Sequence, residues 1–275
     1  MRSSSFAKQI TVNTTRRALV FGAAASAAGC TTAGVSRAPS ARPRTYVLVH
    51  GASQGGWCWR RVSDRLERRG HKVFTPTLTG LGERSHLMSA NVNLDMHITD
   101  IVNVLKWESL EDIVLVGHSY GGWVISGVAE QMRPVISSIV FLDAFMPENG
   151  QKGLDLNSER SKAEIALAVS KGEVSRAAPP AAVWNVNEKD RAWVDAMCTP
   201  HPIATLTDRI ALTGARDRIA RKTYVRAKDY PNPGFDTAYA KIKTDPAWRT
   251  YELPCGHDIM IDMPQRLAEI LLEVT

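Results

Sequence analysis

The stretch Ile113-Val114-Leu115-Val116-Gly117-His118-Ser119-Tyr120-Gly121 decides how the rest of the chain is interpreted. Its first four residues are apolar and mostly β-branched, which predicts a short buried strand. The residues that follow, 122–131, predict a helix. Between strand and helix stands Gly-x-Ser-x-Gly, the pattern of a sharp turn that holds a serine hydroxyl above a sheet. We therefore predict that Ser119 is a nucleophile at the positive end of a helix.

Strand and helix patterns alternate on both sides of this turn. Apolar runs predict further strands at 46–49, 72–76, 136–142, 223–227 and 249–253. Apolar residues at helical spacing predict helices at 57–69, 94–105, 235–243 and 263–274. Asn93 is expected to cap the second of these helices. Repeated strand–helix units predict an α/β fold, in which helices cover both faces of a mostly parallel sheet.

The alternation stops between residues 148 and 218. This segment is polar, helix-prone and irregular, and it contains Pro179-Pro180, Trp184 and Trp193. We interpret it as a mostly helical cap inserted over the strand ends. Residues 45–275 would then form one domain, long enough to bury a sizeable core.

A serine hydroxyl needs a base near neutral pH, and that base needs an orienting acid. Of the seven histidines, His257 stands between the last predicted strand and the last helix. A loop there lies on the same edge of the sheet as Ser119, and serine before histidine is the chain order of this kind of hydrolase. His257 is therefore the predicted base. His118 is next to the nucleophile and is expected to pack, and His50 is expected to support its loop.

Two aspartates compete for the role of the acid. Asp143 ends the apolar run 139–142, where a lone charge would be costly without a partner such as a cationic histidine. Asp229 follows the strand predicted at 223–227, but its neighbouring residues are equally typical of a solvated turn. We favour Asp143 on the cost of burial, and Asp229 stays the alternative.

The oxyanion of an acyl-transfer reaction needs two backbone N–H groups. One is expected from Tyr120, after the nucleophile, and the other from Ala52, in the loop after the first strand. The sequence contains no phosphate-binding glycine motif and no His/Cys/Asp/Glu cluster with metal-ligand spacing. We accordingly expect neither a cofactor nor a metal. Cys58, Cys198 and Cys255 are assigned no disulfide pairing.

The net charge of +6 comes from the start of the chain. Residues 1–44 hold seven of the 34 basic residues and none of the 28 acidic ones, so the remainder carries 27 basic against 28 acidic residues. The domain itself is therefore nearly neutral, which gives no electrostatic case for binding nucleic acid.

The first 30 residues are typical of an export signal. The hexapeptide Thr15-Arg16-Arg17-Ala18-Leu19-Val20 resembles a twin-arginine motif, and a short apolar segment at 18–29 follows. We predict a signal at 1–30, a linker at 31–44, and a periplasmic or extracellular location. Ala27-Ala28-Gly29-Cys30 also resembles a lipoprotein box, so lipidated Cys30 and plain cleavage both stay open. Contact with a membrane is expected only if Cys30 is lipidated.

Five stretches together resemble the α/β-hydrolase superfamily, and within it the plant methylesterase and hydroxynitrile lyase family with its bacterial esterase relatives. They are 47–52 with 55–59 (VLVHGA, GGWCW), 79–84 (TGLGER), 116–122 (VGHSYGG), 141–147 (FLDAFMP) and 256–258 (GHD). The resemblance implies Ser119 and His257 as catalytic residues and the Ala52 and Tyr120 amides as oxyanion donors. For the acid, the resemblance gives two positions: the plant pattern places the acid at Asp229, and the bacterial relatives place it at Asp143.

Two departures argue against cyanohydrin cleavage. Hydroxynitrile lyases have a lysine where this chain has Asp258, and a threonine where it has Gly51. The sequence thus predicts a serine carboxylesterase that forms an acyl-enzyme. Its cap offers tryptophans and aliphatic residues, which favours small to medium uncharged esters. Another reaction on the same fold (lactone opening, C–C cleavage or perhydrolysis) and a non-enzymatic ligand-binding protein are the alternatives.

Overall fold

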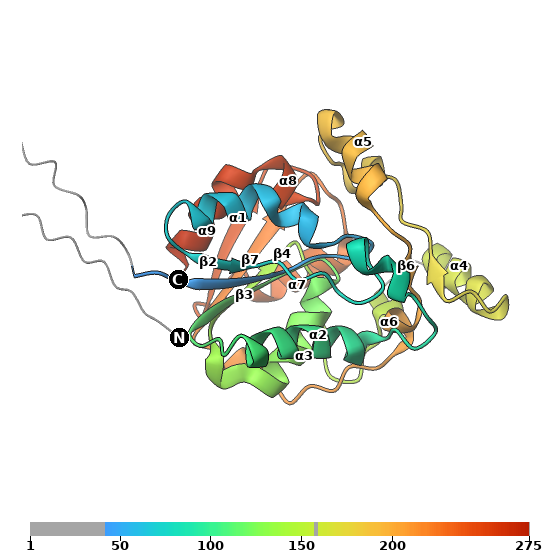
Figure 1. Cartoon of the computed structure of the whole chain (residues 1–275), viewed down its shortest axis with the longest axis horizontal. Coiled ribbons are helices and arrows are strands. Elements are labelled where there is room, and N and C mark those ends of the chain that lie inside the picture. The colour runs from blue at the N-terminus through green and yellow to red at the C-terminus, as the bar shows by residue number, and fades with distance from the viewer. Residues whose placement is uncertain (1–41, 157–158, 275) are drawn as a thin grey trace, which may run out of the picture. The chain divides into compact units, whose positions relative to one another are not determined.

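The computed structural model describes residues 42–156 and 159–274 (Figure 1). The predicted export signal at 1–30, most of the linker at 31–44, and Cys30 lie outside the described residues. No helix among the described residues combines the length and the apolar character needed to cross a membrane.

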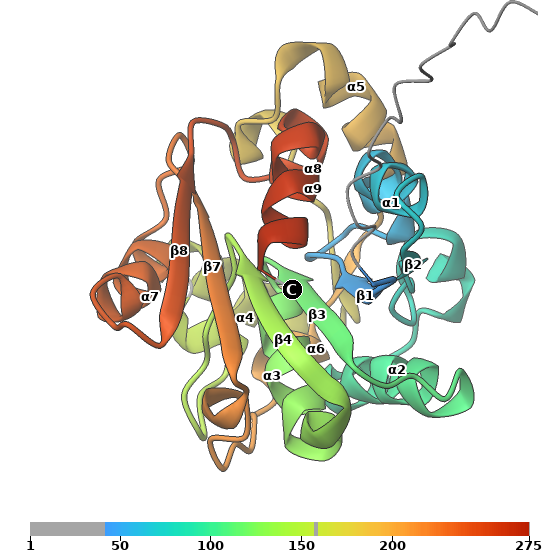
Figure 2. The same ribbon diagram turned by 90° about the vertical axis from the view of Figure 1, so that its left-hand side faces the viewer.

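A parallel sheet of six strands forms the centre of the described domain (Figure 2). The strands are β1 (Thr45–Val49), β2 (Lys72–Phe74), β3 (Ile113–His118), β4 (Ile136–Leu142), β7 (Arg221–Ala227) and β8 (Trp248–Leu253). Their order across the sheet is β2-β1-β3-β4-β7-β8, and every pair is parallel. The pairing brings the carboxyl ends of β3, β4, β7 and β8 to one edge, where the predicted site residues follow.

Helices cover both faces of the sheet, as the sequence predicts. Helices α1 (Arg60–Glu67), α8 (Ile259–Asp262) and α9 (Pro264–Glu273) pack on one face. Helices α2 (Leu94–Trp107), α3 (Gly121–Met132) and α7 (Pro233–Ile242) pack on the other. Residues of one strand alternate between two buried apolar clusters, because successive side chains point to opposite faces. In β1, Tyr46 and Leu48 enter the first cluster and Val47 and Val49 the second.

The elements predicted from the sequence are confirmed to within three residues at each end. Asn93 caps α2 as expected, and its side chain accepts a hydrogen bond from the Met96 N–H at 2.9 Å. The turn of helix α8 was not predicted. Its Ile259, Met260 and Ile261 are all buried, and four residues are too few to show a helical period.

Between β4 and β7 the chain leaves the sheet and forms the cap. Its helices are α4 (Glu159–Ser170), α5 (Glu188–Met197) and α6 (Ala204–Thr207). Shorter pieces connect them: the 3₁₀ turns η4 (Gly153–Leu156), η5 (Ala181–Trp184) and η6 (Arg216–Arg218), and the antiparallel strands β5 (Ser175–Arg176) and β6 (His201–Pro202). In Figure 1, α4, α5, α6 and β6 lie at the right, beyond the carboxyl ends of the sheet strands.

Candidate active site

Ser119 occupies the sharp turn between β3 and α3. Its φ of +53° lies in the left-handed region, which a non-glycine residue rarely adopts. The flanking glycines are required by close approach of the backbone: a Cβ on Gly117 would lie 2.7 Å from the Gly121 carbonyl oxygen, and one on Gly121 would lie 2.9 Å from that of His50. The predicted turn is therefore present, and it holds Ser119 at the edge of a cavity.

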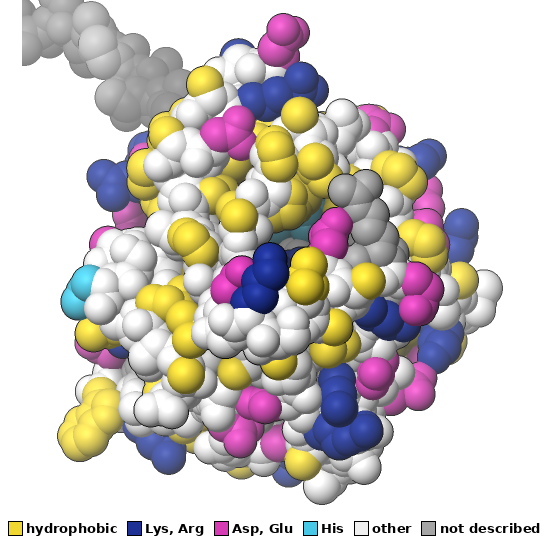
Figure 3. All heavy atoms as spheres, turned by 90° about the vertical axis from the view of Figure 1, so that its right-hand side faces the viewer, with side chains coloured by type: hydrophobic (Ala, Val, Ile, Leu, Met, Phe, Trp, Pro, Cys, Tyr) yellow, Lys and Arg dark blue, Asp and Glu magenta, His cyan; other side chains and the backbone are white. Residues whose placement is uncertain are grey.

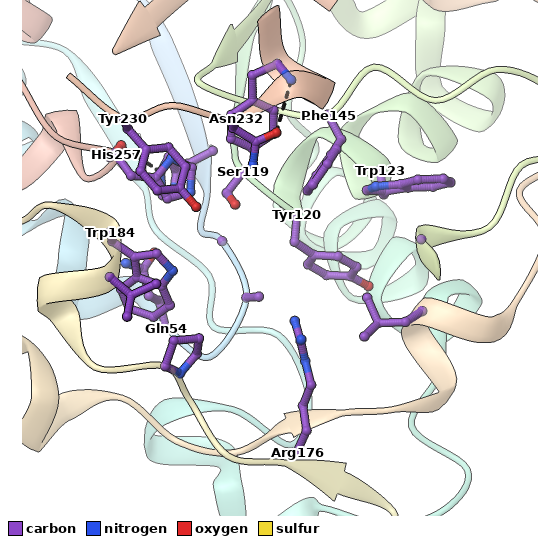
Figure 4. A pocket seen from close by; sticks show the side chains of 18 residues that line it. Gln54, Ser119, Tyr120, Trp123, Phe145, Arg176, Trp184, Tyr230, Asn232 and His257 are labelled. Atoms are coloured by element: carbon purple, nitrogen blue, oxygen red, sulfur yellow. Dashed lines mark hydrogen bonds between the residues drawn. The ribbon is translucent and has the colours of Figure 1, made fainter. Parts of the chain in front are cut away.

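His257 follows β8 and lines the same cavity as Ser119 (Figure 4). Its ring is buried and stacks on Tyr230, with centroids 4.5 Å apart and an interplanar angle of 28°. Nδ1 lies 2.6 Å from Oδ2 of Asp143. This contact fixes the ring and its tautomer, so that Nε2 is the nitrogen left for a serine or a substrate.

Asp143 is completely buried at the end of β4, in a left-handed conformation with φ of +42°. Oδ1 accepts hydrogen bonds from the Ala227 N–H at 3.0 Å and from Nη1 of Arg226 at 2.6 Å. The buried charge thus has the histidine partner that the sequence led us to expect, together with an arginine that it did not. Arg226 also contacts Asp236 at 2.8 Å.

Asp229, the alternative acid, is exposed at the start of the turn after β7. Its backbone N–H donates to the Cys255 carbonyl at 3.2 Å, and its carbonyl accepts from the Asn185 side chain at 3.0 Å. The structure therefore brings Asp143 to His257 and places Asp229 in the solvated turn that its neighbours suggested.

Ala52 and Tyr120 both line the cavity beside Ser119. Within the described part of the chain, neither backbone N–H donates to another protein group. Both amides are thus available to a negative oxygen formed at the serine, which is the arrangement that an oxyanion hole needs.

The cavity has a volume of about 190 Å³, and six Trp, Tyr and Phe side chains are among the residues that line it. Figure 4 shows Trp123 and Phe145 on one side of Ser119 and Tyr230, His257 and Trp184 on the other. Figure 3, which views the molecule from the cap side, shows the surface hollowed here, with a histidine at the floor, hydrophobic side chains above it, and Lys or Arg and Asp or Glu side chains at its lower edge. Among the described residues, no cluster of three His, Cys, Asp or Glu side chains could hold a metal ion.

Residues 46–270 match the model of the alpha/beta hydrolase family. The chain belongs to this family. It is 40% identical over 236 residues to the carbendazim hydrolyzing esterase of Nocardioides sp. (strain SG-4G), a match that covers 82% of this chain and 97% of that protein. It is also 29% identical over 250 residues to the putative chloroplastic methylesterase 11 of Arabidopsis thaliana, covering 83% of this chain and 63% of that longer protein.

Solved structures agree with this assignment. An extracellular alpha/beta-hydrolase from a Paenibacillus species, described as sharing structural and functional homology with tobacco salicylic acid binding protein 2, superimposes with a TM-score of 0.74. It is 26% identical, and the match covers 84% of this chain and 99% of that one. The resemblance stated from the sequence motifs is confirmed at the level of family and fold.

In this alpha/beta hydrolase, the cap holds the loop after β1, residues 50–55, which carries Ala52 and is called the Ala52 loop below. Ser53, next to Ala52, has a φ of +64° and donates its N–H to Nδ1 of His201 at 3.2 Å. Its carbonyl accepts from the Thr199 N–H at 2.9 Å. The Tyr120 hydroxyl lies 3.0 Å from Nδ1 of His97 on α2. Sequence reasoning missed His97 and His201, because both contact groups far along the chain and carry no local pattern.

A second buried link joins the Ala52 loop to the loop that carries His257. Asp258 is fully buried, and both its carboxylate oxygens accept from Nε2 of Gln54, at 2.9 and 3.0 Å. Burial raises the pKa of Asp258 to about 6. A Cβ on Gly256 would lie 2.1 Å from the Asn185 carbonyl, so the His257 loop also presses closely against the cap.

The other histidines near the serine are buried and neutral. His50 accepts the Leu78 N–H on Nε2 at 3.0 Å and contacts the Gly51 carbonyl through Nδ1 at 2.8 Å, as expected of a support for the loop. Burial lowers the pKa of His50 to about 4. His118 donates from Nε2 to the His257 carbonyl at 3.1 Å, and burial holds its pKa well below the usual value. Both therefore position the backbone around the site.

Proposed function

We propose that this protein is a serine carboxylesterase whose nucleophile, base and acid are Ser119, His257 and Asp143. One observation carries the proposal: a buried carboxylate lies 2.6 Å from Nδ1 of a histidine that shares a cavity with a strained serine. The match to the carbendazim hydrolyzing esterase covers 97% of that protein, and its name supports the same class of reaction.

The reaction would begin with attack of the Ser119 oxygen on the ester carbonyl while Nε2 of His257 takes the hydroxyl proton. The carbonyl oxygen becomes an oxyanion and accepts hydrogen bonds from the Ala52 and Tyr120 amides. The tetrahedral intermediate then breaks its bond to the alkoxy oxygen, which receives the proton from His257. Asp143 stabilises the imidazolium between these two transfers without taking its proton.

The acyl group would remain on Ser119 until water replaces the leaving alcohol. His257 removes a proton from this water, whose oxygen attacks the acyl carbonyl and forms a second oxyanion. Collapse of that intermediate breaks the bond to the Ser119 oxygen, which regains its proton from His257. The carboxylic acid leaves, and the enzyme returns to its starting state.

A cavity of about 190 Å³ with aromatic walls suits small to medium esters. The relatives support this range, since one is named for carbendazim hydrolysis and another is a putative methylesterase. We expect hydrolysis of short-chain acyl esters and falling rates as the acyl chain outgrows the cavity.

Hydrolysis of p-nitrophenyl butyrate tests the proposal. The purified protein should release p-nitrophenol, and Ser119→Ala should lose at least about 10⁴-fold in kcat. Ser126→Ala provides the matched control, because Ser126 lies on the same helix but outside the cavity lining. Its activity should stay within about twofold of the wild type. A folded wild type without activity, or an active Ser119→Ala, would contradict the assignment.

We also propose that the chain is exported through the twin-arginine route. The support is sequence alone: Arg16-Arg17 precedes a short apolar segment, and the basic excess is confined to residues 1–44. Replacing both arginines with lysine should retain the protein in the cytoplasm of a host that has this pathway, whereas the unchanged chain should be recovered outside it. Equal recovery of both forms outside the cytoplasm would refute this route.

A further inference from the structure

Arg176 is a cap residue that reaches the active-site cavity. It ends the two-residue strand β5, whose antiparallel pairing sets Arg176 opposite His201 of β6. Figure 4 shows its side chain entering the cavity from the side opposite Ser119 and Asn232. His201 of β6 also accepts the Ser53 N–H. The pairing of β5 with β6 therefore fixes where the Arg176 guanidinium lies.

This guanidinium is the one permanently charged group among the described residues that line the cavity. Its Nε is buried and has no hydrogen-bond partner. No carboxylate of the described chain lies within ion-pair distance of it, and burial lowers its pKa. Glu164 of α4 acts on it electrostatically and raises its pKa, but by less than burial lowers it.

Other buried or half-buried arginines in this protein are differently placed. Arg61 lies 2.7 Å from Asp190, and Arg226 lies 2.6 Å from Asp143. A desolvated charge without such a partner costs free energy, because its lost hydration is not replaced. At Arg176, the cost falls away once an oxygen acceptor enters the cavity, and the fork of N–H donors matches a carboxylate best.

We propose that Arg176 is a specificity-determining residue that binds an oxygen acceptor on the substrate, away from the ester bond that is cleaved. The proposal rests on the esterase function proposed above and replaces the uncharged esters expected from the sequence, because Arg176 lines the cavity. Because Arg176 and Ser119 lie on opposite sides of the cavity, esters with a carbonyl or carboxylate oxygen remote from the reacting carbonyl should be preferred over purely apolar esters of equal length. A carboxylate should bind most strongly, because a charge-assisted hydrogen bond is stronger than a neutral one.

Three methyl esters of matched length test this preference: methyl hexanoate, methyl 5-oxohexanoate and monomethyl glutarate. They place a methylene, a ketone or a carboxylate at the same position of the acyl chain. The wild type should show the highest kcat/KM for monomethyl glutarate and the lowest for methyl hexanoate, with about a tenfold or larger difference between them. Each compound is also measured as a competitor of p-nitrophenyl butyrate hydrolysis, where the inhibition constants should follow the same order.

Variants of Arg176 separate recognition from a structural role. Arg176→Met should remove the preference, lowering kcat/KM for the glutarate ester about tenfold or more and leaving methyl hexanoate within about twofold. Arg176→Lys should keep part of the preference for the carboxylate, because it retains the charge but not the planar fork. Arg209→Met is the control, since Arg209 is a cap arginine outside the cavity lining that donates to the Gly150 carbonyl.

Two results would overturn the proposal about Arg176 while leaving the esterase function intact. One is a wild type that hydrolyses or binds the three esters equally well. The other is an Arg176→Met variant that loses activity on all three by the same factor. Failure of the esterase function is distinguishable, because the wild type would then release no p-nitrophenol from p-nitrophenyl butyrate.

Discussion

Two residues of the site, Ser119 and Asp143, share an unusual backbone conformation. Both have positive φ, at +53° and +42°, and both directly follow neighbouring parallel strands. Such strain persists only where the surrounding structure holds it, and it is concentrated at functional sites. Here the holding groups are visible: the Ser119 N–H donates to the Leu142 carbonyl, and the Asp143 N–H donates to the Val225 carbonyl at 2.7 Å. These hydrogen bonds to neighbouring strands fix the backbone of both residues, and with it the direction of both side chains.

Arg226, which donates a hydrogen bond to Asp143, should also stabilise the folded protein. It lies in a buried pair with Asp143, with side chains 5% and 0% exposed. Arg226→Met would leave the Asp143 charge without this partner, so we expect a loss of about 3 kcal/mol in the free energy of unfolding, measured by urea denaturation. Arg266→Met is the comparison, since Arg266 makes more exposed pairs with Glu269 and Glu273. Arg266→Met should lower the free energy of unfolding by less than about 1 kcal/mol. An equal loss in both variants would show that the buried Arg226 pair is no more stabilising than the exposed pairs of Arg266.

Residues with a local pattern could be predicted from the sequence. Ser119 stands in a strand–turn–helix signature, and His257 stands in the loop that chain order selects, so both could be named. For the acid, the sequence favoured Asp143 and left Asp229 as the alternative, because both aspartates follow strands and only the path of the two loops distinguishes them. Arg226, His201 and Arg176 gave no signal, since each acts through groups brought together by folding.

At the level of elements, the cap strand β6 supports the Ala52 loop. His201 accepts the Ser53 N–H, and burial keeps the pKa of this histidine well below its usual value, so Nδ1 stays an acceptor. His201→Phe would keep the ring but remove the acceptor. The loop that carries the Ala52 amide would then be held less firmly, and kcat should fall about tenfold with little change in KM.

His71→Phe is the matched control for this variant. His71 Nδ1 also accepts a backbone N–H, from Arg44 at 3.1 Å, but this residue is not part of the cavity lining. Steady-state kinetics on p-nitrophenyl butyrate should show wild-type kcat for His71→Phe. A normal kcat for His201→Phe, or an equal fall in both variants, would show that the cap does not position the loop.

The sheet and its helices could be predicted because each element is long enough to show its period. Parallel strands buried on both faces read as continuous apolar runs, such as 113–116 and 139–142. The elements of the cap were harder to predict from the sequence. Strands β5 and β6 have two residues each, and they exist through pairing with one another rather than through a sequence pattern. The cavity wall that carries Arg176 was therefore invisible in the sequence.

At the scale of the whole domain, buried neutral histidines should control the response to acid. Burial strongly lowers the pKa of four of them, His50, His97, His118 and His201. Burial also lowers the pKa of His71. In the unfolded chain a histidine titrates near pH 6.5. Their contribution to stability is complete above that pH and is lost as the pH falls toward about 4, the value for His50 and His97.

Asp258 acts in the opposite sense. Its pKa in the fold, about 6, is above its unfolded value, so the folded state gains stability from its protonation as the pH falls from 6 to 4. Four histidines outweigh one carboxyl, and we expect the free energy of unfolding in urea to be at least about 2 kcal/mol lower at pH 5 than at pH 7. The difference should shrink in His201→Phe. A stability that is constant or higher at pH 5 would contradict this balance.

Labelling with a fluorophosphonate tests whether Ser119, His257 and Asp143 act together in one active site. We expect a single adduct that maps to Ser119, formed about 10³- to 10⁴-fold more slowly in Asp143→Asn, whose side chain favours the wrong tautomer of His257. The rate should be unchanged in Asp229→Asn. An adduct elsewhere, no adduct on the folded protein, or a rate that falls in Asp229→Asn and not in Asp143→Asn would contradict the assignment of these three residues.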